Sequence, residues 1–253
     1  MLRSVDIELK LPEGKKLHSS MGSVMHGALM CDIVDRDTAD WLHDLSTMRP
    51  YSQSVFWDRE RSLPIWRVCT LTGQAEERVI EPLLKSLGNS IFLQQKGYDI
   101  ELVKLAADYS ADYGRLADEV FLAENSPREF SLRFLTVGSF KHDGSYMVFP
   151  DLRMLYSSLQ MKWNAFSPTN KLEDRDLASF LADTSSMYRY RLGSQPFSLE
   201  SQTIYGFAGE MSVRLQGSDM SRRLAALLMK LAPYTGIGIK TALGMGAVRS
   251  TMR

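Results

Sequence analysis

A glycine-rich segment with one lysine lies near the C-terminal end of the chain, and its residue types suit anion binding. It runs from Gly236 to Gly246. Glycine adopts backbone angles that are closed to other residues and lets another backbone approach closely, so such a segment can present several N–H groups to one anion. The pattern predicts phosphate contacts, and a flexible connecting loop stays open as the alternative. The candidate contacts are Gly236, Gly238, Lys240, Gly244 and Gly246.

The order of elements around this segment argues against two nucleotide-binding motifs. A dinucleotide-binding fingerprint runs from a strand through a glycine turn into a helix. Here the segment follows an expected helix, Ser221–Leu231, and precedes an expected strand, Ala247–Thr251. A Walker-type loop needs Gly-Lys-Ser/Thr, whereas Lys240 follows Ile239. The sequence therefore favours a different kind of phosphate ligand.

His26 is the residue best suited to proton transfer, because histidine titrates near neutral pH. Its neighbours on an expected helix include Gly22 and Gly27. Glycine inside a helix costs about 1 kcal/mol relative to alanine, so two of them indicate a constraint other than helix stability, such as room for a bulky substrate. A purely structural histidine is the alternative. His18 is a second, less favoured candidate.

Composition and charge set the class of protein. The chain has 253 residues, two cysteines and a formal net charge of zero. Two cysteines make no disulfide framework, and no segment resembles a signal peptide or a membrane span, so we expect a cytoplasmic protein without membrane contact. Residues 187–253 hold nine Lys/Arg and three Asp/Glu, a net charge of +6. This segment favours one polyanion-binding face, although a solvated charged surface would look the same.

The hydrophobic pattern predicts the same order of elements twice. In the first half, strands are expected near 5–11, 53–57, 64–71, 90–95 and 98–106, with helices near 19–33, 38–45 and 76–87. In the second half, strands are expected near 130–135, 188–192, 204–215 and 246–251, with helices at 152–166 and 221–231. Strand–helix–strand–strand–helix–strand is the ferredoxin-like order. We therefore expect an α+β fold of two tandem ferredoxin-like domains, residues 1–125 and 126–253.

Several short motifs follow one another in the second half: Phe134-Leu135-Thr136, Phe149-Pro150-Asp151, Trp163-Asn164-Ala165-Phe166, Gly206-Phe207-Ala208-Gly209 and the glycine-rich segment. This succession resembles the repeat-processing endoribonucleases of CRISPR systems, members of the RAMP superfamily. In the first half the main match is Met25-His26-Gly27-Ala28-Leu29. The resemblance implies an enzyme that cuts the repeat RNA of CRISPR precursor transcripts into guide RNAs without a metal ion or other cofactor. It implies attack by a 2′-hydroxyl, which leaves a 2′,3′-cyclic phosphate and a 5′-hydroxyl.

The resemblance places the catalytic histidine at His26. Attack by a 2′-hydroxyl needs a base for its proton and an acid for the leaving oxygen, and a cation or hydroxyl to stabilise the transition state. Lys15, Lys16 and Ser23 are the candidates for this second role. Many relatives have a tyrosine or lysine near the histidine, and Tyr51 is the nearest tyrosine here.

RNA contacts are expected mainly in the second half. Arg189 and Arg191 alternate with tyrosines, so both arginines can share one face of a strand. The remaining candidates are Arg222, Arg223, Lys240 and Arg249. Further CRISPR effector subunits and a second copy of the chain are candidate partners. No histidine or cysteine spacing matches a metal motif.

Two other functions remain open from sequence alone. A non-catalytic RNA-binding subunit of a CRISPR effector complex would have no need of His26. A ferredoxin-like enzyme acting on small molecules would carry a closed apolar pocket and no basic groove.

Overall fold

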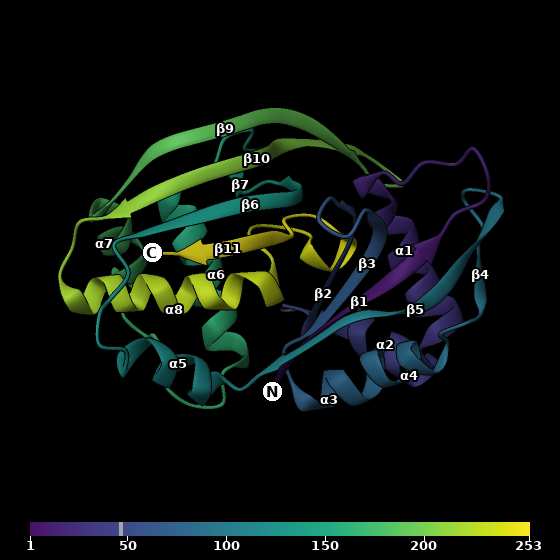
Figure 1. Cartoon of the computed structure of the whole chain (residues 1–253), viewed down its shortest axis with the longest axis horizontal. Helices are drawn as coiled ribbons and strands as arrows, with labels where there is room; N and C mark the ends of the chain where they lie inside the picture. The colour runs from purple at the N-terminus through teal and green to yellow at the C-terminus, as the bar shows by residue number, and fades with distance from the viewer. Residues whose placement is uncertain (46–47) are drawn as a thin grey trace.

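The computed structural model describes residues 1–45 and 48–253 and contains two large antiparallel sheets and one two-stranded sheet (Figure 1). The first sheet has the order β2-β3-β1-β5-β4. Its central strand β1 pairs with β3 on one side and with β5 on the other. The strands are β1 (Leu2–Lys10), β2 (Tyr51–Asp58), β3 (Leu63–Thr70), β4 (Ser90–Leu93) and β5 (Tyr98–Ala111).

Short helices cover one face of the first sheet. These are α1 (Gly22–Ala28), which continues as a π-helical turn over Leu29–Ile33, α2 (Arg36–Asp44), α3 (Gly73–Ala75) and α4 (Glu81–Lys85). Met25 and Leu29 of the first helical segment are fully buried in the same apolar core as Trp66 and Val68 of β3. This apolar packing fixes the side of the helix that faces the sheet and leaves His26 toward its edge.

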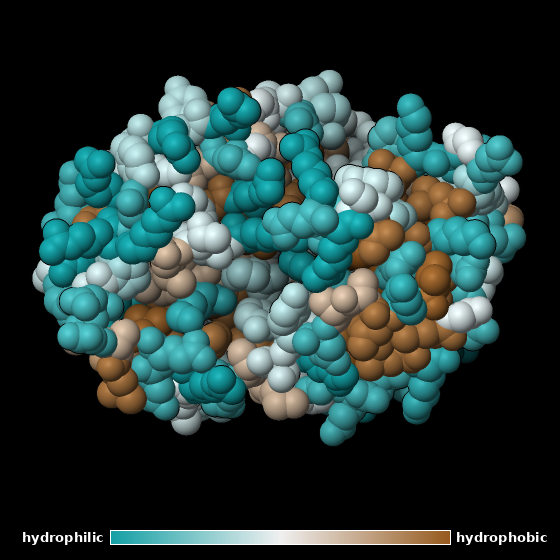
Figure 2. Space-filling view, viewed as in Figure 1, coloured by the Kyte–Doolittle hydropathy of each residue, from teal (hydrophilic) through white to brown (hydrophobic). Residues whose placement is uncertain are grey.

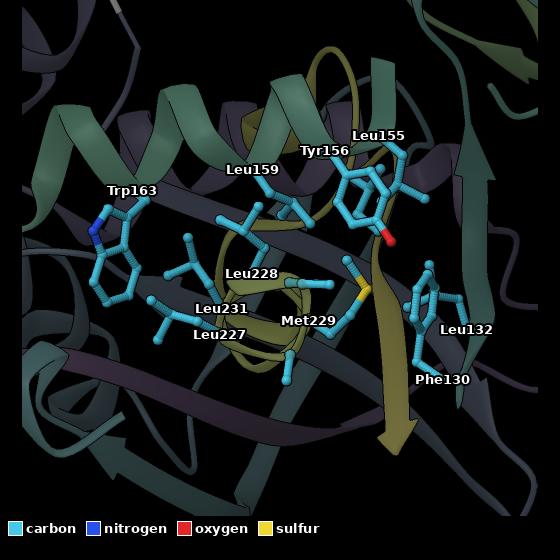
Figure 3. Close-up of a cluster of buried hydrophobic side chains, with 14 of the residues drawn as sticks. Phe130, Leu132, Leu155, Tyr156, Leu159, Trp163, Leu227, Leu228, Met229 and Leu231 are labelled. Atoms are coloured by element: carbon cyan, nitrogen blue, oxygen red, sulfur yellow. The ribbon is translucent and has the colours of Figure 1, made fainter. Parts of the chain in front are cut away.

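The second sheet has the order β11-β6-β10-β9. Its strands are β6 (Glu129–Gly138), β9 (Ser185–Ser198), β10 (Thr203–Leu215) and β11 (Val248–Met252), and a small hairpin joins β7 (Lys141–His142) to β8 (Ser145–Tyr146). Helices α6 (Leu152–Phe166), α7 (Leu177–Asp183) and α8 (Asp219–Thr235) pack beside it. Figure 3 shows α6 and α8 meeting through Leu159 and Leu228, with Phe130 of β6 completing the core.

Both sheets have the ferredoxin-like order, with the first and third strands of each motif in the centre, so the predicted fold class is confirmed. Some elements differ from the prediction. Helix α8 continues through Pro233 to Thr235, and helices α5 (Tyr113–Phe121) and α7 were not predicted. Helix α5 packs into the second core through Leu116 and Val120.

The two sheets are linked across their open faces. Arg249 of β11 forms ion pairs with Asp58 at 2.8 Å and with Glu60 at 2.7 Å, both at the turn between β2 and β3. The space-filling view shows hydrophilic side chains over the part that carries α7, α8 and β9, and apolar ones over the part that carries β1, β3 and β5 (Figure 2). No helix in the described ranges is long and apolar enough to cross a membrane.

Candidate active site

His26 of α1 meets a tyrosine from the edge of the first sheet. Its Nδ1 lies 2.8 Å from the hydroxyl oxygen of Tyr51, and the two rings are stacked at an angle of 15°. Either partner can donate this hydrogen bond, depending on the tautomer of the imidazole. Tyr51 is the first residue of β2 and only 1% exposed, whereas His26 is half-buried.

The surroundings keep the imidazole neutral at pH 7. Burial lowers the pKa of His26 to about 4, and the positive charge of Arg49 acts in the same direction. Burial raises the pKa of Tyr51 well above its usual range, so its hydroxyl stays protonated. If His26 donates Nδ1–H to Tyr51, its Nε2 is unprotonated and can accept a proton from a hydroxyl group.

The two glycines of α1 have different surroundings. A Cβ on Gly22 would lie 2.8 Å from the Cα of Gly244 and 2.8 Å from the carbonyl oxygen of Leu243. The expectation that Gly22 leaves space for a substrate is therefore wrong, because the glycine-rich loop fills that space. A Cβ on Gly27 would meet nothing within 4 Å, so for Gly27 the expectation stays a prediction.

Several backbone N–H groups of the glycine-rich loop already donate hydrogen bonds to other groups of the protein. The N–H of Ile237 donates to Gly246 at 2.8 Å, that of Ile239 to Ser139 at 3.1 Å and that of Gly246 to Val137 at 2.9 Å. The N–H of Gly238 donates to the Ser158 hydroxyl at 3.0 Å. These groups are not available to hold one anion in the way the sequence suggested.

The four loop glycines serve close packing. Gly236, Gly244 and Gly246 are buried with positive φ angles, and Gly238 is half-buried with a φ of 85°. A Cβ on Gly246 would lie 2.0 Å from the carbonyl oxygen of Ile237, and one on Gly238 would lie 2.2 Å from that of Ser139. Direct RNA contact by the three buried glycines, which the sequence predicted, does not agree with this conformation.

A buried lysine forms hydrogen bonds with backbone carbonyls at the start of the glycine-rich loop. Lys162 of α6 donates to the carbonyl oxygens of Thr235 at 3.2 Å, Gly236 at 2.8 Å and Gly238 at 3.4 Å. Two of these acceptors belong to the end of α8 and its cap, where carbonyl groups lack helical partners. Burial lowers the pKa of Lys162 to about 7.

An open groove of about 870 Å³ lies beside Tyr51, between β2, α6 and the glycine-rich loop. Its lining includes apolar side chains such as Met154, Met161 and Phe166. Five lysine and arginine side chains also line it, and Asp151 is the only carboxylate among the described lining residues. They are Arg49, Lys141, Arg153, Lys162 and Lys240. The groove therefore combines positive charge with apolar surface next to the His26–Tyr51 pair.

The residues proposed to assist His26 lie elsewhere or are already engaged. The ammonium of Lys15 lies 5.3 Å from the ring centre of Tyr98, at the start of β5. Tyr51 belongs to β2, at the opposite edge of the sheet from the β4–β5 hairpin. Lys16 is exposed in the same segment. Ser23 lies three residues before His26 on α1 and its hydroxyl donates to Ser20 at 3.5 Å.

The open face of the second sheet carries a row of charged side chains. Arg249, Arg133, Glu210 and Arg191 lie opposite one another on β11, β6, β10 and β9, and Arg133 pairs with Glu210 at 2.8 Å. Arg189 lies on β9, as Arg191 does, and is paired with Ser212 of β10. Both arginines are exposed on β9, and no ion pair involves them among the described residues.

Three arginines that the sequence predicts as RNA contacts form ion pairs or hydrogen bonds within the protein. Arg249 pairs with Asp58 and Glu60, as described above. Arg223 is buried, pairs with Asp219 at 2.6 Å and donates to the carbonyl of Val120 at 2.6 Å. Arg222 donates to the Ser126 hydroxyl at 2.8 Å and to Gly217 at 2.9 Å. Sequence reasoning did not anticipate these contacts because most of the partners, Ser126, Val120, Asp58 and Glu60, come from distant segments.

Sequence reasoning also missed contributors to the site. Arg49 and Tyr51 both precede the strand predicted at 53–57, and only their position beside α1 brings them to His26. Lys162 lies inside a predicted helix beside Trp163, and a lysine directly before a buried aromatic residue was the available signal. In residues 1–45 and 48–253, no group of three or more His, Cys, Asp or Glu side chains could hold a metal ion.

Fold and site together define a protein of two ferredoxin-like units with a histidine–tyrosine pair beside a cationic groove. The family model for "CRISPR-associated endoribonuclease Cas6" matches residues 132–248. A protein of that name from Streptococcus thermophilus is 30% identical over 226 residues, 88% of this chain and 88% of that protein. Another from Mycobacterium tuberculosis (strain CDC 1551 / Oshkosh) is 27% identical over 250 residues, 97% of this chain and 76% of that protein.

The structure agrees with these similarities. It matches the structure of a Cas6 product complex with a TM-score of 0.78 at 21% identity, over 99% of both chains. The chain belongs to the CRISPR-associated endoribonuclease Cas6 family. The expected family and the expected class of enzyme, an endoribonuclease, are confirmed.

Proposed function

We propose that this enzyme cleaves the repeat RNA of CRISPR precursor transcripts by 2′-hydroxyl attack, with His26 as the proton acceptor. The observation that carries the proposal is the 2.8 Å hydrogen bond between Nδ1 of His26 and the hydroxyl of Tyr51, which itself lines a cationic groove. Similarity to proteins named CRISPR-associated endoribonucleases supports the choice of substrate.

In this mechanism the 2′-oxygen forms a bond to the adjacent phosphorus, and the bond from phosphorus to the 5′-oxygen breaks. Nε2 of His26 takes the proton of the 2′-hydroxyl, and the leaving 5′-oxygen receives a proton from the imidazolium or from water. The products are a 2′,3′-cyclic phosphate and a 5′-hydroxyl. The nucleophile belongs to the RNA and the base to the protein, so the reaction needs no metal ion.

Cations of the groove stabilise the charge that develops on the phosphate oxygens. Arg49 is close enough to His26 to lower its pKa, and Lys240 lies across the groove on the glycine-rich loop. The same charges hold the phosphates on either side of the cleaved bond. We assign this role to Arg49 and Lys240 in place of Lys15, Lys16 and Ser23.

The exposed arginines of β9 extend the RNA surface beyond the groove. Arg189 and Arg191 bind the RNA backbone, because unpaired guanidinium groups form bidentate contacts with phosphates. Binding to other CRISPR effector subunits or to a second copy of the chain, and a cytoplasmic location, remain predictions of this proposal.

The test uses end-labelled repeat RNA with the purified enzyme in a chelator. Replacing His26→Ala should lower the single-turnover cleavage rate by about 100-fold or more and leave the dissociation constant for RNA within about twofold. A substrate with a 2′-deoxy nucleotide upstream of the cut should bind and stay intact. Cleavage of the deoxy substrate would make water the nucleophile, and full activity of His26→Ala would favour a role in RNA binding only.

A further inference from the structure

Gln53 connects the helix of His26 to the glycine-rich loop. It lies on β2 two residues after Tyr51 and is 2% exposed. Its side-chain amide donates to the carbonyl oxygen of Gly22 at 2.6 Å and to that of Ala242 at 3.1 Å. The first acceptor belongs to α1 and the second to the loop, so one side chain bonds both elements.

The orientation of this amide is fixed by a third partner. The indole N–H of Trp66 donates to the side-chain oxygen of Gln53 at 3.0 Å. Because both backbone partners are acceptors and Trp66 is a donor, only one placement of the amide oxygen and nitrogen satisfies all three. Gln53 thus uses both ends of its amide in a buried environment.

The backbone of α1 brings this bond close to the chemistry. In an α-helix the carbonyl of residue 22 accepts the hydrogen bond from the N–H of residue 26. Gln53 therefore bonds the Gly22 carbonyl, one helical turn before His26. Gly22 and Gly244 touch through their backbones at the same contact between helix and loop. A shift of the contact between Gly22 and Gly244 would move the N-terminal end of α1 and turn the imidazole relative to Tyr51.

We infer that Gln53 is a positioning residue for His26, and that it couples the placement of the imidazole to the conformation of the glycine-rich loop. The inference rests on the proposed function, because it assumes that His26 takes part in cleavage. Gln53 itself does not face the groove, so its loss should affect the reaction and not RNA binding.

The test replaces Gln53→Met, which keeps length and removes both donors. We expect the single-turnover rate to fall at least about tenfold, since small misplacements of catalytic groups cost up to about 100-fold. The dissociation constant for RNA should stay within about twofold, and the midpoint of the pH–rate profile should shift because His26 changes surroundings.

The matched control is Gln160→Met. The Gln160 amide also donates to two backbone carbonyls, those of Leu172 and Asp174, each at 2.7 Å, but it lies on α6 outside the groove lining. This variant should cleave at the wild-type rate. Equal rates and pH profiles for Gln53→Met and wild type would overturn the inference, and so would a loss confined to RNA affinity.

A second variant approaches the same contact from the loop, in case Gln53→Met fails to fold. Gly244→Ala adds a Cβ against Gly22 and should reproduce the loss of rate with RNA affinity retained, whereas Gly73→Ala, with open space around it, should be neutral. Wild-type rates for Gly244→Ala would contradict the coupling. If the wild-type enzyme cleaves through His26 and these variants are unimpaired, the inference fails and the proposed function stands.

Discussion

At the scale of single residues, burial lowers the pKa of His26 most, and the charge of Arg49 lowers it further. Replacing Arg49→Met removes a cation that disfavours the imidazolium, so the pKa of His26 should rise from about 4 toward its usual value. Since the mechanism needs the neutral ring, the acid limb of the pH–rate profile should move to higher pH. Single-turnover rates across the acidic and neutral range measure this shift.

Arg153→Met is the matched control for this experiment. Arg153 also lines the groove, so its loss should weaken RNA binding, but it is not among the causes of the lowered pKa of His26. Its acid limb should coincide with that of the wild type. An acid limb that stays in place for Arg49→Met would show that His26 is not the titrating group.

The Tyr51 hydroxyl orients the ring of His26. Replacing Tyr51→Phe removes one hydrogen bond, for which a loss of about 1 kcal/mol or more is typical, so the cleavage rate should fall about five- to tenfold. Tyr156→Phe removes a comparable buried bond, to Ser185 at 2.9 Å, and should not change the rate at temperatures where the protein is folded. An unchanged rate for Tyr51→Phe would remove Tyr51 from the mechanism.

Sequence reasoning selected His26 as the catalytic candidate because its evidence is local, the resemblance over Met25–Leu29 and the glycines on either side of the histidine. It could not locate the partners. Tyr51 is 25 residues away, and the contact depends on which edge of the sheet α1 packs against. Arg223 looked like a surface cation because the carbonyl group of Val120 becomes its neighbour only after α8 packs against α5, although Asp219 lies one turn before Arg223 in α8 itself.

At the scale of elements, periodicity predicted most of the helices and strands. Helix α6 was placed at its observed ends because Asp151 caps its first turn and Leu155, Leu159 and Trp163 form a regular apolar face. The end of α8 was placed too early because Pro233 normally disfavours a helix interior. Here it lies in the last turn, where few helical hydrogen bonds follow it.

The loop conformation depends on Lys162, and Lys162→Met tests this. The variant loses three hydrogen bonds to backbone carbonyls, so its free energy of unfolding should fall by about 2 kcal/mol. Chemical denaturation measures the change.

The pH dependence of that difference has a defined sign. The folded state releases the Lys162 proton near pH 7, whereas the unfolded chain keeps it up to about pH 10.4. Between these values the unfolded state binds more protons, so the wild type gains stability relative to Lys162→Met as pH rises. A difference that is constant between pH 6 and pH 9 would contradict the burial of a titrating amine.

At the scale of the whole molecule, the packing of α5 bears on where the two domains meet. The predicted boundary at residue 125 assigns α5 to the first domain, but Tyr113, Leu116 and Val120 belong to the second core. We therefore propose a boundary near residue 112, after β5. The sequence offered no signal for this, because an amphipathic helix does not indicate which core it joins.

The arginines of β9 should make RNA affinity depend on salt. Each phosphate contact adds about 0.7 to 0.9 to the slope of log K against log salt concentration. The double variant Arg189→Ala, Arg191→Ala should therefore lower this slope by about 1 to 2, and retain the cleavage rate at saturating RNA. Arg36→Ala, on the exposed face of α2, is the control, and an unchanged slope for the double variant would place the RNA elsewhere.

The pairing of β2 with β3 has a consequence for refolding. Tyr51 and Gln53 point to the same side of β2, opposite Thr70 and Val68, at the outer edge of its sheet. A slip of a single residue would turn both side chains to the wrong side. Molecules with such an error would be compact but inactive. The specific activity after dilution from denaturant should therefore measure the fraction of chains in which β2 and β3 pair in the correct register.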